Sequence, residues 1–173
     1  MSGGFKRFGV CTTRSLVGLG LVLFATSVPG ADSQSTTIAR GAGTTIIQGG
    51  TGGTTPLPVL TTLAFHAEQA GGVVTGDFEC LARAPASSGS AQFTANAMYV
   101  TGQITGAVVN GDAATLTGTA TITGLGAGSN VPFQIVVHRG GPGARAVLTT
   151  SGLVFNEILL EGSIEVFQPQ AGD

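Results

Sequence analysis

Apolar and polar residues alternate along most of the chain after about residue 58, and glycines interrupt this alternation at short intervals. Side chains of a β-strand point in turn to opposite faces, so a strand with one buried face shows a period of two. No window of a dozen residues carries the 3.6-residue apolar stripe of an amphipathic helix. The pattern predicts an all-β protein of about seven or eight strands, either an antiparallel β-sandwich or a small β-barrel.

Residues 63–80, LAFHAEQAGGVVTGDFEC, predict a β-hairpin. Both central glycines tolerate positive φ, and a two-residue turn there pairs residues whose numbers sum to 143. Phe65 then lies opposite Phe78, and His66 lies opposite Asp77 on the other face. A three-residue loop would instead place Phe65 opposite a carboxylate, so we expect the two-residue turn.

The same alternation predicts which residues of the later strands face inward. We expect a loop at residues 110–112 and a tight turn within RGGPGAR, with the flanking strands keeping their apolar faces together. The glycines of the repeated Thr-Gly steps face inward, where a missing side chain lets a bulky residue approach. The predicted core comprises Leu63, Phe65, Phe78, Cys80, Met98, Val100, Ile104, Val108, Ala114, Leu116, Ala120, Ile122, Phe133, Ile135, Val137, Leu160, Ile164 and Val166.

Few residues suggest chemistry. His66, Asp77 and Glu79 form a predicted polar cluster on the outer face of the hairpin, and we expect a solvated surface there rather than a catalytic centre. Abundant serines and threonines make any choice of nucleophile arbitrary. A metal site of His66 and His138 with Asp77 or Glu79 is the alternative, but no ligand spacing supports one. We therefore predict no catalytic, cofactor-binding or metal-binding residue.

Three glutamates near the end of the chain recur at four-residue spacing: Glu157, Glu161 and Glu165. An even spacing keeps all three on one face of a strand. The apolar residues Leu160, Ile164 and Val166 alternate with them. We expect the three carboxylates on the solvated face rather than in a calcium site.

The first 31 residues have the layout of a secretory signal peptide, with a basic start, an apolar run over 16–28 and small residues after it. The apolar run is too short for a membrane-spanning helix, which needs about 20 residues; a retained anchor is the alternative. Residues 32–57 are rich in Ser, Thr and Gly and predict a flexible leader, with at most one short strand at 44–48. We expect a single all-β domain over 58–168 and a tail over 169–173.

Removal of the signal peptide leaves four arginines, no lysine and nine acidic residues, so the net charge of the remainder is 4 − 9 = −5. Nucleic-acid binding needs a basic surface, and anionic membranes attract basic segments. We therefore expect no nucleic-acid partner and no membrane span in the exported chain. Cys80 is its single cysteine, which excludes an intramolecular disulfide and favours a small buried side chain.

Three segments of the sequence resemble small secreted all-β modules of bacterial proteins, the post-COAP-type domains. They are VVNGDAATLTGTATITG, VPFQIVVHRGGPGAR and the terminal GSIEV, within residues 57–166. The resemblance implies an exported all-β fold and no established activity. In that family the Pro-Gly turn carries acidic residues, whereas this chain has His138, Gly141 and Ala146 in that region, so a cation site there is not expected.

The sequence as a whole favours a secreted, non-enzymatic β-domain that binds an unknown ligand or associates with the cell envelope. A small-molecule carrier with an apolar barrel interior is the first alternative, because many inward positions are Gly or Ala. A hydrolase that uses His66 and Asp77 is a weaker one.

Overall fold

The structure is a computed structural model, and it describes residues 35–50, 54, 57–83 and 98–168. The predicted signal peptide (1–31) and tail (169–173) lie outside these residues. The described residues contain no helix and eight antiparallel strands. The strands are β1 (Thr36–Ile47), β2 (Leu60–Ala70), β3 (Val73–Arg83), β4 (Met98–Asn110), β5 (Ala113–Gly124), β6 (Gly128–His138), β7 (Arg145–Thr150) and β8 (Leu153–Val166).

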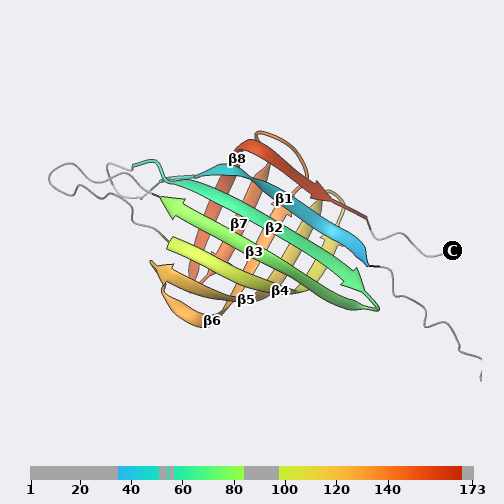
Figure 1. Cartoon of the computed structure of the whole chain (residues 1–173). Coiled ribbons are helices and arrows are strands. Elements are labelled where there is room, and N and C mark those ends of the chain that lie inside the picture. Colours follow the sequence, from blue (N-terminus) through green and yellow to red (C-terminus); the bar gives the residue numbers. More distant parts are fainter. Residues whose placement is uncertain (1–34, 51–53, 55–56, 84–97, 169–173) are drawn as a thin grey trace, which may run out of the picture. The chain divides into compact units, whose positions relative to one another are not determined.

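Each strand pairs with the next, and β1 also pairs with β8, so the sheet closes into an up-and-down barrel (Figure 1). Closure leaves no unpaired sheet edge. β7 is short, and the residues just before it also bond to β8. The amide of Leu159 donates a hydrogen bond to the carbonyl of Ala144, 2.8 Å away. The predicted all-β class is confirmed. Of the two predicted architectures, a sandwich or a barrel, the structure is the barrel.

β1 contradicts the prediction of a flexible leader over residues 32–57. Twelve residues of that segment form a strand that pairs on both sides. Two of its inward positions are the glycines Gly41 and Gly43, and side chains of neighbouring strands fill the space beside them. A Cβ at Gly41 would lie 2.7 Å from the Cε1 of Phe65, and one at Gly43 would lie 2.7 Å from the Cδ1 of Leu159.

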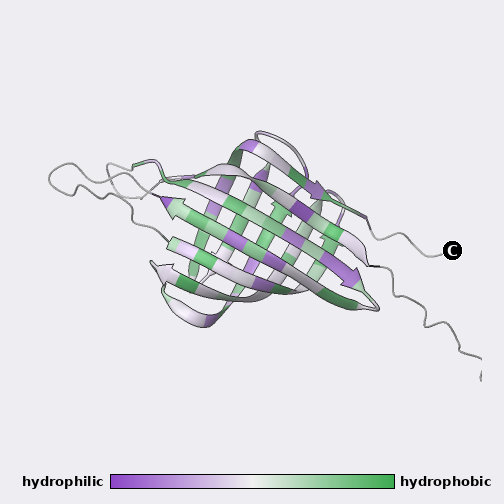
Figure 2. Cartoon of the chain, in the orientation of Figure 1, coloured by the Kyte–Doolittle hydropathy of each residue, from purple (hydrophilic) through white to green (hydrophobic). Residues whose placement is uncertain are grey.

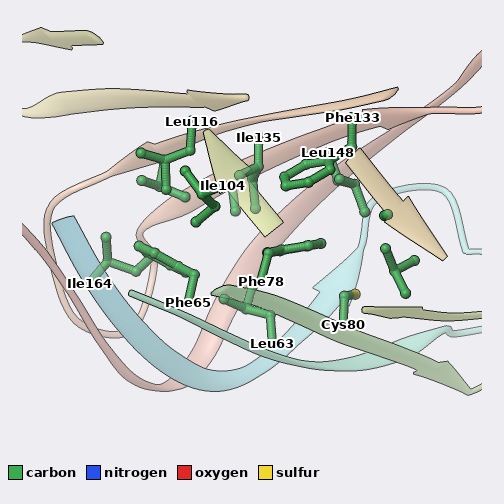
Figure 3. Close-up of a cluster of buried hydrophobic side chains, with 14 of the residues drawn as sticks. Leu63, Phe65, Phe78, Cys80, Ile104, Leu116, Phe133, Ile135, Leu148 and Ile164 are labelled. Carbon is green, nitrogen blue, oxygen red and sulfur yellow. The ribbon is translucent and has the colours of Figure 1, made fainter. Parts of the chain in front are cut away.

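The hairpin of β2 and β3 has the predicted register. Phe65 pairs with Phe78 and His66 with Asp77, and both turn glycines have positive φ. Apolar and polar residues alternate along large parts of the strands in Figure 2, as expected for a barrel with a buried interior. Most of the predicted core is buried, as Figure 3 shows for part of it; the exceptions are Val108 and Leu160.

Val108 and Leu160 are 67% and 47% exposed, so their predicted inward positions are wrong. The cause in each case is a β-bulge, which inserts one extra residue and reverses the alternation beyond it. In β4 the register with β5 shifts between Ile104 and Gly106. In β8 the register with β1 shifts so that Leu160 has no partner. The predicted loop at 110–112 is accordingly a tighter turn, in which Asn110 pairs with Ala113.

Side chains fill the middle of the barrel. The rings of Phe78 and Phe133 stack there with their centroids 5.1 Å apart. A Cβ at the inward Gly102 would lie 2.7 Å from the Cε1 of Phe133, so the glycine makes room for the ring as predicted. Eight strands enclose a space that side chains can fill or that holds one small ligand. The two rings therefore occupy the middle of the barrel (Figure 3).

Candidate functional site: a buried carboxyl at one end of the barrel

Glu157 is 3% exposed and points into the barrel, which contradicts its predicted place on the solvated face. The bulge at Leu160 is the physical reason. Before the bulge, Glu157 and Leu159 face inward; after it, Glu161 is exposed and Glu165 is half-buried on the outer side. The four-residue spacing of the three glutamates therefore does not keep them on one face.

Two buried threonines contact the carboxyl of Glu157. Thr45 and Thr61 are cross-strand partners on β1 and β2, and both side chains face inward. The Oγ1 of Thr61 lies 2.6 Å from the Oε2 of Glu157, and the Oγ1 of Thr45 also contacts Oε2. The two hydroxyls contact each other as well. Three oxygen atoms, one from each side chain, thus form a closed cluster inside the barrel.

Burial raises the pKa of Glu157, and the hydrogen bonds from Thr45 and Thr61 oppose this effect. No salt bridge joins Glu157 to a cation among the residues that the structure describes. A buried carboxylate without a cation is costly, so the protonated form gains.

Glu157 lines a cavity of about 320 Å³ at the end of the barrel where β1 and β3 finish and β2 and β4 begin, the left end in Figure 1. The rest of the lining is mostly apolar. Leu125, which is 51% exposed, also lines the cavity and marks where it reaches the surface. The lining residues are Ile47, Gly50, Val59, Thr61, Cys80, Ala82, Met98, Leu125, Leu148, Phe155 and Glu157.

One oxygen of the carboxyl remains free. Both threonine contacts go to Oε2, and within the described ranges no hydrogen bond reaches Oε1. Every fully buried side-chain nitrogen or oxygen in those ranges has a hydrogen-bond partner. Because Oε1 has none, it is not fully buried, and we place it at the cavity that Glu157 lines. The cavity thus has one unused carboxyl acceptor on a wall that is otherwise mostly apolar.

Cys80 lies on the same wall and is 3% exposed, as expected for a small buried side chain. Burial, with a smaller contribution from the charge of Glu157, raises the pKa of its thiol. The thiolate is the nucleophilic form of cysteine, so this environment suppresses reactivity. Among the residues that the structure describes, Cys80 has no disulfide partner.

The predicted outer cluster is where the sequence placed it. His66, Asp77 and Glu79 are exposed on the outer face of β2 and β3. Asp77 accepts a hydrogen bond from the Nε2 of Gln103 (2.6 Å), and Glu79 accepts one from the hydroxyl of Tyr99 (2.6 Å). In the part of the chain that the structure describes, no hydrogen bond joins His66 to Asp77. The pair is adjacent but not connected as a catalytic base and its orienting acid would be.

A wide, shallow groove of about 790 Å³ runs over this outer cluster and on to Thr121 and Asn130. His138, the last residue of β6, does not line this groove. Its Nδ1 lies 3.9 Å from the Oδ1 of Asp112, in the turn between β4 and β5. Across residues 35–50, 54, 57–83 and 98–168, no three His, Cys, Asp or Glu side chains are grouped as metal ligands.

Comparison of the chain with protein-family models, with curated proteins and with solved structures finds no match. No stretch of the described residues forms a helix of the length and apolarity that crossing a membrane requires. The function must therefore be argued from the barrel and its end cavity.

Proposed function

We propose that this protein is an exported binding barrel that holds one small, mainly apolar molecule in the cavity at the end of the barrel. The observation that carries the proposal is the cavity itself, in which apolar side chains surround a single free acceptor on Glu157. Natural small-molecule sites combine an apolar lining with a few polar groups that fix orientation. Export rests on the layout of residues 1–31, and the resemblance to secreted post-COAP-type domains agrees with it.

The size of the cavity limits the ligand. Its volume of about 320 Å³ is near the lower end for ligand pockets, which run from about 300 to 1,000 Å³. At about 30 Å³ for each non-hydrogen atom, as in liquid water, it has room for roughly ten such atoms. The stacked rings of Phe78 and Phe133 close off deeper entry. Both observations argue against a long lipid buried along the whole barrel axis.

Met98 offers a direct test. It lines the cavity, is 4% exposed, and is one of two methionines in the chain. We expect benzene, added to protein labelled with ¹³C at the methionine methyl groups, to shift the Met98 signal in a saturable way. A Met98→Leu variant assigns the signal. An unmoved signal in the folded protein at saturating benzene would refute the proposal.

Two alanines provide a matched pair of controls. Ala82 lies on β3 and lines the cavity, whereas Ala64 lies on β2 and is exposed on the outer face. Leucine at position 82 fills part of the cavity and should abolish the benzene shift. Leucine at position 64 adds the same atoms outside the barrel and should leave the shift unchanged.

A further inference from the structure

The free oxygen of Glu157 restricts the chemistry of the ligand, provided that the cavity binds one as proposed above. The hydroxyls of Thr45 and Thr61 both donate to Oε2, so Oε1 is the carboxylate oxygen that is left to accept a hydrogen bond from a ligand. A complementary ligand must therefore present a donor.

A hydroxyl group matches this site better than an amine does. An ammonium group brings three N–H donors, and each one left unpaired in an apolar cavity costs free energy. Apart from Glu157, the side-chain acceptors of the lining are the hydroxyl of Thr61, already engaged in the cluster, and the weakly accepting sulfurs of Cys80 and Met98. A hydroxyl brings one donor for one free acceptor.

We propose that the ligand is a neutral, apolar molecule of roughly ten non-hydrogen atoms with one hydroxyl group, which donates a hydrogen bond to Oε1 of Glu157. Thr45 and Thr61 act as positioning residues: they hold Oε2 and so direct Oε1 toward the cavity. The apolar body of the ligand then contacts side chains such as Met98 and Leu148.

Three probes of equal size test the inference on the whole, purified chain. 1-Octanol carries the hydroxyl, its isomer heptyl methyl ether carries only an acceptor, and octylamine carries an ammonium group. The Met98 methyl signal and calorimetry report binding. We expect 1-octanol to bind about tenfold more tightly than the ether, because the ether leaves Oε1 unpaired and places an acceptor against it. We also expect it to bind more tightly than octylamine.

Two variants at position 157 separate the hydrogen bond from the shape of the cavity. Glu157→Gln keeps a carbonyl oxygen and should retain the preference for 1-octanol over the ether. Glu157→Leu removes the acceptor and should reduce that preference to less than about twofold, with ether binding intact.

The outcomes distinguish the two proposals. If 1-octanol and the ether bind the wild-type cavity equally well, the hydroxyl inference is overturned while the binding barrel stands. If octylamine binds most tightly, an ionised carboxylate is the anchor and the inference is again overturned. If none of the probes, nor benzene, moves the Met98 signal, the binding barrel itself is refuted. The wild-type comparison needs no variant to fold.

Discussion

Replacing Phe133 with alanine and Gly102 with alanine, singly and together, tests the central packing of the barrel. Phe133 is 4% exposed, stacks on Phe78 and lies over Gly102, where a Cβ would come within 2.7 Å of its ring. The first substitution removes a ring and the second adds a methyl group at the place the ring occupies. The two changes should therefore compensate each other in part.

The magnitudes follow from these contacts. Phe133→Ala should lower the free energy of unfolding by about 4 kcal/mol, within the usual range for a buried Phe, because Gly102 has no side chain to fill the space. Gly102→Ala should cost about 1–2 kcal/mol, since overpacking outweighs the better strand propensity of alanine. In the double variant the clash is gone and the new methyl group fills part of the cavity. Its total cost should be about 3–4 kcal/mol rather than the sum of about 5–6.

Denaturant titration followed by far-ultraviolet circular dichroism measures all three variants, since the chain has no tryptophan to report on packing. Ile164→Ala on β8 serves as the control, because β8 does not pair with β4. Its cost should add to that of Gly102→Ala within about 0.5 kcal/mol. If the costs of Phe133→Ala and Gly102→Ala also add within that limit, the ring of Phe133 does not pack on Gly102 as argued.

Three further predictions concern the outer face, the buried carboxyl and the signal peptide. His66→Gln should change the free energy of unfolding by less than about 1 kcal/mol and leave probe binding unaltered, because the side chain is exposed; a large effect in either assay would reopen a catalytic role. Burial raises the pKa of Glu157, so the folded state keeps this proton to higher pH than the unfolded chain, in which it titrates near 4.5. Stability should therefore fall as the pH rises from about 4.5 through the raised pKa, and Glu157→Gln should remove this part of the pH dependence in titrations at several pH values. Export should remove the first 27 to 31 residues, and N-terminal sequencing of exported material that began at Met1 would contradict it.

The hairpin of β2 and β3 was predictable because local chemistry and packing agree. Two adjacent glycines allow the tight turn, and one register alone brings Phe65 opposite Phe78. A shift by one residue would have placed a charged side chain in the core. Where a turn and a pair of aromatic residues specify the same register, the sequence is sufficient.

The bulges were harder to predict, because the strands were assigned on an unbroken two-residue alternation. A bulge adds one residue and interrupts that alternation. A glycine closely follows the bulges in β4 and β8: Gly106 comes after Thr105, and Gly162 comes after Leu160. Gly162 has φ +105°, and a Cβ there would lie 2.1 Å from the carbonyl oxygen of Ala42. A glycine inside a strand pattern often marks a bulge. Applied to LLEGSI, that rule would have reversed the phase and placed Glu157 inside the barrel.

β1 was missed for a different reason. Its sequence, TTIARGAGTTII, is poor in large apolar residues, so its composition resembles a flexible linker. The bulk that fills its inner face belongs to other strands, as the ring of Phe65 does opposite Gly41. The end cavity was unpredictable on similar grounds, because its wall is assembled from six strands and two connecting segments. Only three-dimensional closure brings Glu157 beside Thr45 and Thr61.

Glu157 bears on stability and on binding in opposite directions. Burying a carboxyl costs free energy, and an apolar residue at such a position is often neutral or stabilising. Glu157→Leu should therefore leave the free energy of unfolding at pH 7 unchanged or raise it by up to about 2 kcal/mol, while the preference for 1-octanol is lost. A binding group maintained at some cost in stability gives this combination. If the variant instead lost more than about 1 kcal/mol in denaturant titration, the carboxyl would be a structural partner of Thr45 and Thr61, and its free oxygen would no longer indicate a ligand.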